Sequence, residues 1–130
     1  GGHVHIQDYA TLSGGVAVHH FTTIGSYSFI GGLSRVIQDV PPYMLADGNP
    51  ARSRCINIVG LKRNDFDQEQ ITALADAHRW LFRAKVGFEH AREYLRANSQ
   101  LLPCIEQLLD FIQYQRGGRH GRGRDARRAA

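Results

Sequence analysis

Residues 1–40 read GGHVHIQDYATLSGGVAVHHFTTIGSYSFIGGLSRVIQDV, and an aliphatic side chain returns at every sixth position of this stretch. The repeating residues are Ile6, Leu12, Val18, Ile24, Ile30 and Val36. A second register, two residues ahead, holds small or β-branched residues: Val4, Ala10, Val16, Thr22, Ser28 and Ser34. Helices repeat roughly every 3.6 residues, so nothing helical produces this period. It predicts a parallel β-helix, in which short strands wind into stacked coils.

Three hexapeptides per triangular coil predict that aliphatic side chains eighteen residues apart stack on one another. The predicted pairs are Ile6 with Ile24, Leu12 with Ile30, and Val18 with Val36. Strands of adjacent coils would lie roughly 4.8 Å apart, so each inward column is close-packed. Glycines at 14–15, 25 and 31–32 are expected at the corners, where tight turns or a positive φ are needed. The period does not set the handedness, although general crossover rules favour right-handed winding.

The repeat region, residues 1–50, is expected to end in a turn. Pro41 and Pro42 remove two backbone donors, which suits a chain that leaves a sheet ladder. Residues 43–46 can form one last strand, and residues 51–66 are predicted to be a connecting loop. The repeat amounts to little more than two coils and is already running at residue 1, whereas repeat arrays generally need three units and a cap. We therefore expect the chain to be the C-terminal part of a longer protein.

A helical domain is predicted for residues 67–115. Asp67 with Gln70 forms a capping-box pattern, and a helix would run from there to about Gly87. Its predicted apolar face is Ile71, Leu74, Ala75, His78, Leu81 and Phe82. Second and third helices are predicted over residues 88–97 and 102–115, the latter with Pro103 in its first turn. Three short amphipathic helices bury little alone, so we expect them to pack on each other and on a neighbouring surface.

The net charge of +4 is concentrated in the tail and does not indicate a nucleic-acid-binding protein. Residues 116–130 hold six arginines and one aspartate, whereas residues 1–115 hold ten basic and eleven acidic side chains. This Gly- and Arg-rich tail is predicted to be disordered. The chain has no apolar run long enough to span a bilayer, and its first residues do not lead us to expect a signal peptide. Cys55 and Cys104 have no metal or redox spacing, so we expect reduced thiols in a soluble, cytoplasmic protein.

Histidines are the candidate chemical groups of the repeat: His3, His5, His19 and His20. Because the inward columns are filled with aliphatic residues, these imidazoles are expected to face solvent or a neighbouring subunit. The pattern does not favour a metal site, because no cysteine or carboxylate stands nearby at ligand spacing. Hydrogen bonding or proton transfer in a cleft is the alternative to plain surface exposure.

Several motifs together resemble one family. They are Gly2-His3-Val4, His19-His20-Phe21, Gln38-Asp39-Val40-Pro41-Pro42-Tyr43, Gly48-Asn49 and Asn57-Ile58-Val59-Gly60-Leu61-Lys62-Arg63. Over residues 1–115 the chain resembles the C-terminal part of the acyl-carrier-protein–UDP-N-acetylglucosamine O-acyltransferases that open lipid A biosynthesis. The resemblance implies a left-handed parallel β-helix, a homotrimer, an active site between adjacent subunits, and no cofactor. It also implies transfer of an R-3-hydroxyacyl group from acyl carrier protein to the sugar 3-hydroxyl.

Residue roles follow from the resemblance as expectations. The general base would be a histidine upstream of Gly1, and the Gly2 backbone N–H would stabilise the thioester oxyanion. The expected substrate-binding residues are His3, His19 and His20 near the sugar and acyl chain, and Asn57 and Arg63 near the UDP portion. Gly32 matches the position that limits acyl-chain length, and Phe29 would shape the same groove.

Three positions of this sequence depart from the family pattern. The family more often has glutamine at His20, an acidic residue at Val59 and a second arginine at Asn64, which affects the expected nucleotide contacts.

The alternative function is a non-catalytic module that trimerises or binds acyl carrier protein through basic side chains. Those side chains would be Arg52, Arg54, Lys62 and Arg63.

Overall fold

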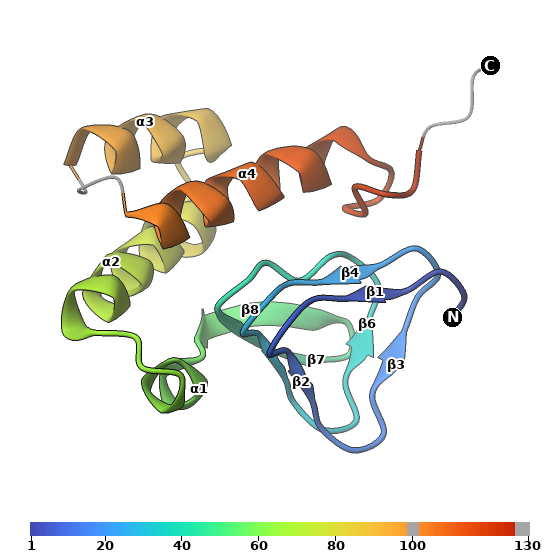
Figure 1. Cartoon of the computed structure of the whole chain (residues 1–130). Helices are drawn as coiled ribbons and strands as arrows, with labels where there is room; N and C mark the ends of the chain where they lie inside the picture. The colour runs from blue at the N-terminus through green and yellow to red at the C-terminus, as the bar shows by residue number, and fades with distance from the viewer. Residues whose placement is uncertain (99–101, 127–130) are drawn as a thin grey trace.

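The computed structural model describes residues 1–98 and 102–126, and its first part is a stack of parallel coils (Figure 1). Each hexapeptide contributes one two-residue strand. The strands are β1 (His5–Ile6), β2 (Thr11–Leu12), β3 (Ala17–Val18), β4 (Thr23–Ile24), β5 (Phe29–Ile30) and β6 (Arg35–Val36). The parallel pairs are β1 with β4, β2 with β5 and β3 with β6, in the register predicted from the period.

Stacking decides how deeply each aliphatic residue is buried. Ile24 and Ile30 have no exposed surface and Val36 is 1% exposed, whereas Ile6 is 50% exposed. The difference arises because β4 and β5 are covered on their second side, by Val40 and by β7 (Met44–Gly48). Among the described residues, no strand pairs with the second side of β1. An inward aliphatic residue is therefore fully buried only where the chain covers it on both sides along the coil axis.

The corners depend on aromatic and aliphatic residues more than on the expected glycines. A left-handed φ recurs every six residues through the coils, at His3, Tyr9, Gly15, Phe21, Tyr27 and Leu33. Gly14 and Gly32 lie in the corner turns, as predicted, but without a positive φ, and Gly25 and Gly31 lie just before the turns. Gly25 is needed for a different reason, because a Cβ there would lie 2.4 Å from the Pro42 nitrogen.

The second register of small residues also has a structural reason. Ser28 and Ser34 are buried, and their hydroxyls donate 2.7 Å hydrogen bonds to the carbonyls of Gly25 and Gly31. A buried carbonyl without a partner is costly. Serine three positions after the glycine therefore provides the glycine carbonyl at the corner with a hydrogen-bond donor.

Residues 51–66, predicted as a connecting loop, instead hold regular structure. The predicted last strand, β7, pairs parallel to β5, and β8 (Ala51–Ile56) returns antiparallel to it. Helix α1 (Ile58–Arg63) follows. The loop prediction was wrong because β8 buries only its end residues, Ala51 and Ile56, and therefore lacks the alternating pattern of a strand.

The remaining helices form a bundle on one side of the coils (Figure 1). They are α2 (Gln68–His78), the π-helical turn η1 (Arg79–Arg83), α3 (Phe88–Asn98) and α4 (Pro103–Gly117). The capping box of Asp67 and Gln70 is present as predicted. The buried faces of these helices share one hydrophobic cluster with Tyr43, Met44 and Ile56 of the last strands, which confirms the expected packing on a neighbouring surface.

Two buried polar residues connect the bundle to the coils. The Tyr43 hydroxyl donates a hydrogen bond to Gln107 of α4, and burial raises the pKa of Tyr43 well above its usual range. His78 of α2 is 6% exposed and lies 3.4 Å from the Ser53 carbonyl of β8. Burial lowers the pKa of His78, and the Arg83 charge acts in the same direction, while the Ser53 contact raises it.

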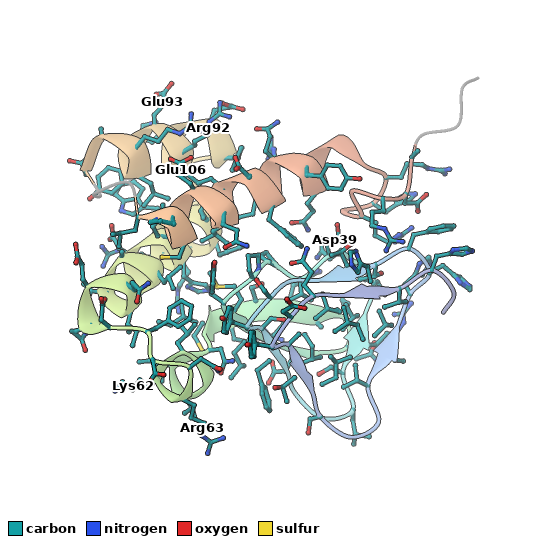
Figure 2. All side chains as sticks on the ribbon, in the orientation of Figure 1. Asp39, Lys62, Arg63, Arg92, Glu93 and Glu106 are labelled. Atoms are coloured by element: carbon teal, nitrogen blue, oxygen red, sulfur yellow. The ribbon has the colours of Figure 1, made fainter. Side chains whose placement is uncertain are left out.

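Residues 118–126, which follow α4, make defined contacts with the coils, contrary to the predicted disorder of this part of the tail. Residues 127–130 of the predicted tail lie outside the described residues. Arg122 is 7% exposed and donates to the Ile37 carbonyl at 2.7 Å and to the Asp125 carboxylate. Asp39, 3% exposed, accepts from the Thr23 N–H and the Gly123 N–H, each at 2.8 Å. Figure 2 shows Asp39 between the coils and α4. The prediction failed because a segment rich in glycine and arginine was stabilised by a buried acceptor 84 residues away.

Both cysteines are free thiols: Cys55 is exposed and Cys104 is buried. In the described parts of the chain, no helix combines the length and apolar character required to cross a membrane.

Asp39→Ala should destabilise the fold, because it leaves two backbone N–H groups without their acceptor. We expect a loss of roughly 2 kcal/mol in the free energy of unfolding measured in urea. Asp110→Ala, on the exposed face of α4, is the matched control and should change it by less than about 0.5 kcal/mol. Equal effects of the two substitutions would contradict the role given to Asp39.

Stability should fall with pH below about 6.5, the ordinary pKa of histidine. The folded state resists protonation of His78 and the unfolded state does not, so unfolding takes up a proton as the pH falls through this range. His78→Gln keeps a donor for Ser53 and should flatten the stability profile between about pH 7 and pH 5. His90→Gln, at an exposed position of α3, is the matched control in the same urea titrations, and equal flattening by the two substitutions would contradict the role given to His78.

Candidate functional site

A pocket of about 470 Å³ lies where α1 meets one flank of the coils. Its coil side is formed by Tyr9, Thr11, Tyr27, Phe29 and Leu45. Its other side is formed by Cys55, Ile56, Asn57, Ile58, Val59, Gly60, Arg63 and Asn64. The structure therefore brings together three of the residues expected from the sequence: Phe29, Asn57 and Arg63.

Arg63 supplies the positive charge of this pocket. It lies in the last turn of α1 and is exposed, and it is the one cationic side chain among the described residues that line the pocket. Figure 2 shows Arg63 projecting from α1 away from the helical bundle. A guanidinium presents donors in a fixed fork that suits phosphate or carboxylate oxygens. The pocket can thus bind an anion at one edge and an apolar or aromatic group along its walls.

Asn57 lies at the back of the pocket and is 7% exposed. Its side-chain nitrogen donates to the Tyr27 carbonyl at 2.9 Å, and its side-chain oxygen accepts from the Gly60 N–H at 3.3 Å. Asn64, at the other end of α1, donates its side-chain N–H to the Gly60 carbonyl at 2.8 Å. Each of these side-chain amides therefore makes at least one hydrogen bond within the protein.

Two aromatic residues of the pocket wall were not among the predicted site residues. Tyr9 and Tyr27 lie eighteen residues apart, one coil above the other, and their rings stack with centroids 5.0 Å apart. Tyr43 continues the stack at 6.0 Å from Tyr27. The eighteen-residue spacing of the first two was readable in the sequence, and it would have indicated a column of rings at one corner.

The expected histidines gather at a different corner. The rings of His3 and Phe21 stack with centroids 4.9 Å apart, and the rings of His19 and His20 meet edge to face at 5.6 Å. The Gly2 N–H donates a 2.7 Å hydrogen bond to His20 Nδ1. The backbone group expected to bind an oxyanion is therefore occupied by a side chain of the same corner. These imidazoles are exposed, as predicted.

Gly32 belongs to the third corner. A Cβ at Gly32 would meet the Gly14 carbonyl oxygen at 3.5 Å, an ordinary contact, so the fold does not itself require glycine there. The next residue, Leu33, is 83% exposed. Within one chain, the pocket residues, the histidines and Gly32 thus lie in three separate places. No group of three metal-binding side chains occurs in the ranges that the structure describes.

A stack of hexapeptide coils with a pocket beside its last strands, followed by helices, defines a hexapeptide-repeat β-helix protein. Residues 39–123 match the family model described as UDP N-acetylglucosamine O-acyltransferase, domain 2. The chain therefore belongs to the UDP-N-acetylglucosamine O-acyltransferase family, and the resemblance stated from the sequence is confirmed.

Curated relatives agree with this assignment. The acyl-[acyl-carrier-protein]–UDP-N-acetylglucosamine O-acyltransferase of Aliivibrio salmonicida is 42% identical over 112 residues, which cover 86% of this chain and 43% of the relative. The enzyme of the same name from Synechocystis is 36% identical over 121 residues, covering 91% of this chain and 44% of the relative. This chain spans less than half the length of both proteins.

Solved structures show the same architecture. The UDP-N-acetylglucosamine acyltransferase of Bacteroides fragilis matches with a TM-score of 0.83 and 31% identity, over 96% of this chain and 46% of that chain. The Arabidopsis enzyme matches with a TM-score of 0.79 and 36% identity, over 85% of this chain and 41% of that chain.

Proposed function

We propose that the protein to which this chain belongs transfers an R-3-hydroxyacyl group from acyl carrier protein to the 3-hydroxyl of UDP-N-acetylglucosamine, the first step of lipid A biosynthesis. The sugar oxygen forms an ester with the acyl carbon, the thioester bond breaks, and the carrier leaves as its thiol. The family match over residues 39–123 and the names of the relatives support this activity over the non-catalytic alternative. We place the reaction in the cytoplasm.

The observation that carries the proposal is the pocket that Arg63 lines together with the aromatic residues Tyr9, Tyr27 and Phe29. The family's acceptor is a nucleotide sugar, and its diphosphate needs a cation. Arg63 can bind the diphosphate through charge-assisted hydrogen bonds. Tyr9 and Phe29 then offer flat or apolar surfaces to the rest of the ligand. Val59, at a position where an acidic residue is more usual, leaves this wall apolar.

The histidine corner is assigned to the sugar and acyl portions of the substrates. His3 and His19 would position them, while the general base would be a histidine on a coil that precedes Gly1. The Gly2 N–H becomes available to a thioester oxyanion only when His20 releases it, because a single N–H serves one strong acceptor at a time. His20 would then be free to bind substrate.

A homotrimer of left-handed coils would explain why the candidate residues are spread over separate corners. Corners of adjacent subunits face each other across a cleft in such a trimer. One subunit's histidines can then share a site with groups from its neighbour, including Gly32 and Phe29 along the acyl chain. Each site would be complete only in the assembly.

Arg63→Ala should weaken the binding of UDP by roughly tenfold or more, because it removes the charge-assisted hydrogen bonds to the diphosphate. Calorimetry with UDP and the full-length protein provides the measurement. Lys62→Ala is the matched control, since Lys62 is the adjacent residue of α1 but does not line the pocket. UDP binding that weakens equally in both variants would point to general electrostatics and contradict the assignment of Arg63.

His19→Ala should slow acyl transfer by about an order of magnitude or more if this residue positions the reacting groups. The assay is transfer of hydroxyacyl groups from acyl carrier protein to UDP-N-acetylglucosamine by the full-length protein. His5→Ala, an exposed histidine of β1, serves as the control. Normal turnover of His19→Ala would remove the assignment, and the absence of any transfer by the unaltered full-length protein would overturn the proposed function.

A further inference from the structure

A buried carboxylate closes the hydrogen-bond ladder of the coils where the six-residue period ends. In the coils, the N–H of the first residue of a strand donates to a carbonyl seventeen residues later. The pairs are His5 with Thr22, Thr11 with Ser28 and Ala17 with Ser34, at 2.9–3.0 Å. The carbonyl seventeen residues after Thr23, that of Val40, accepts from Gly25 instead. The Thr23 N–H donates to an oxygen of Asp39 at 2.8 Å, so a side chain replaces the backbone here.

This replaced bond lies directly beside the histidine corner. The corner turn, residues 19–22, is attached to the end of the stack by two N–H groups. The His19 N–H donates to the Val36 carbonyl at 2.9 Å, and the Thr23 N–H donates to Asp39. The first attachment is part of the backbone ladder, whereas the second can be released without unwinding the coil. The direction of the corner imidazoles therefore depends on the position of Asp39.

Residues 118–126, which we call the C-terminal clasp, hold Asp39 in place after turning back from α4 to the coils (Figure 1). The Gly123 N–H donates to the second carboxylate oxygen of Asp39 at 2.8 Å. The Gly121 carbonyl accepts from the Asp39 backbone N–H at 2.9 Å. The histidine corner and the clasp are thus attached to the two oxygens of one carboxylate.

The clasp has one conformation that fits this place. Arg122 is 7% exposed, and it donates to the Ile37 carbonyl at 2.7 Å and to the Asp125 carboxylate at 2.8 Å. A Cβ at Gly123 would lie 2.5 Å from the Tyr114 ring, so the chain approaches α4 too closely for any other residue. These contacts direct the Gly123 N–H at Asp39.

Without the clasp, Asp39 would be a buried charge with too few partners. Burial raises the pKa of the Asp39 carboxyl against the effect of four compensating groups. The groups are the N–H donors of Gly123 and Thr23 and the charges of Arg122 and Arg124, and three of them belong to the clasp. A buried carboxylate that loses its partners turns to solvent or takes up a proton. Either change weakens the charge-assisted bond from Thr23.

We infer that the C-terminal clasp positions the histidine corner through Asp39, so that residues at the end of the chain set the geometry of acyl transfer. The catalytic consequence rests on the proposed function, in which this corner holds the sugar and acyl portions of the substrates. The dependence of Thr23 on the clasp does not. The nucleotide pocket is a separate place, because its described lining includes neither clasp residues nor residues 36–40. Loss of the clasp should therefore slow transfer and spare the binding of UDP.

Deleting residues 118–130 from the full-length protein should lower kcat for acyl transfer by about fivefold or more, because displaced reacting groups react more slowly. The affinity for UDP, measured by calorimetry, should change by less than about twofold, as expected for distant sites. Deleting residues 127–130 alone spares the clasp and is the matched control. Partial unfolding would lower kcat and the number of UDP sites together. An unchanged kcat, or a loss only in proportion to the UDP sites, would overturn the inference.

Arg122→Gln weakens the clasp without removing any of the chain. It should lower kcat by about threefold, the size expected for lost hydrogen bonds of a charged group. Arg119→Gln removes the same charge from the same segment, but Arg119 bonds to Asp125 and Arg122 through its backbone, so kcat should persist. Equal losses in the two variants would indicate an effect of net charge and overturn the role given to Arg122.

A double-mutant cycle tests whether the clasp acts through Asp39. Asparagine has nearly the shape of aspartate but a single acceptor oxygen, so Asp39→Asn cannot accept from Thr23 and Gly123 with separate oxygens. Deleting the clasp in the Asp39→Asn background should lower kcat by less than about twofold further. The full effect of the deletion in that background would show that the clasp acts by another route.

Hydrogen exchange tests the structural part without any substrate. Deleting the clasp should speed exchange of the Thr23 amide, while the Thr11 amide, bonded to the Ser28 carbonyl, keeps its protection. If the unaltered full-length protein transfers no acyl group, the proposed function fails while this measurement still decides the structural part. Faster exchange at Thr23 and the corner amides supports the inference, and unchanged exchange at Thr23 overturns it.

Discussion

The structure depends on one constraint, the eighteen-residue register that places each aliphatic side chain directly on the one a coil away. Every strand of the coils has only two residues, so none has a lateral sheet of useful extent to stabilise it. The stabilising contacts run along the axis, where Ile24 and Ile30 lose all of their exposed surface between neighbours. At roughly 25 cal/mol per Å² of buried apolar surface, these columns supply the main favourable term of the coil region. The outward positions remain available for chemistry.

The same register controls the corners. L-residues in the left-handed region cost about 1–2 kcal/mol each, and the coils place five non-glycine residues there within residues 1–40. Stacking offsets part of this cost, because a ring at one corner meets a ring eighteen residues later, as with Tyr9 and Tyr27 or His3 and Phe21. The corner geometry directs these rings outward, one above the other. Both the aromatic wall of the pocket and the histidine corner arise from this stacking.

Sequence periodicity predicted what repeats and failed where the structure depends on single long-range contacts. The coil register, the capping box of Asp67 and the buried face of α4 all follow local rules. The ordered segment after α4 does not, because the partner of Gly123 is Asp39, far away in the sequence. Helix α1 was not predicted for a similar reason, because its capping residue Asn57 is held by a hydrogen bond to the Tyr27 carbonyl on the coil. For the candidate site, the motifs placed Asn57 and Arg63 near a nucleotide and Phe29 in an acyl groove, and the structure places all three around one pocket. The contribution of α1 to this pocket could not be predicted, because it depends on where a segment outside the repeat lies against the coils.

The pocket lies where the six-residue period of the sequence ends. Within the coils each residue's environment is dictated by its position in the hexapeptide, so a pocket deeper than a surface groove has no place to form. Residues 41–66 break the period, and β8 and α1 return along the flank of the coils to close one side of a cavity. Because α1 is too short to be stable without the coil, the cavity inherits its rigidity from the stacked corners of Tyr27 and Tyr43. A regular scaffold can thus hold a charged side chain such as Arg63 in place through a short irregular segment, provided that the segment's own polar groups are used to bind it to the scaffold.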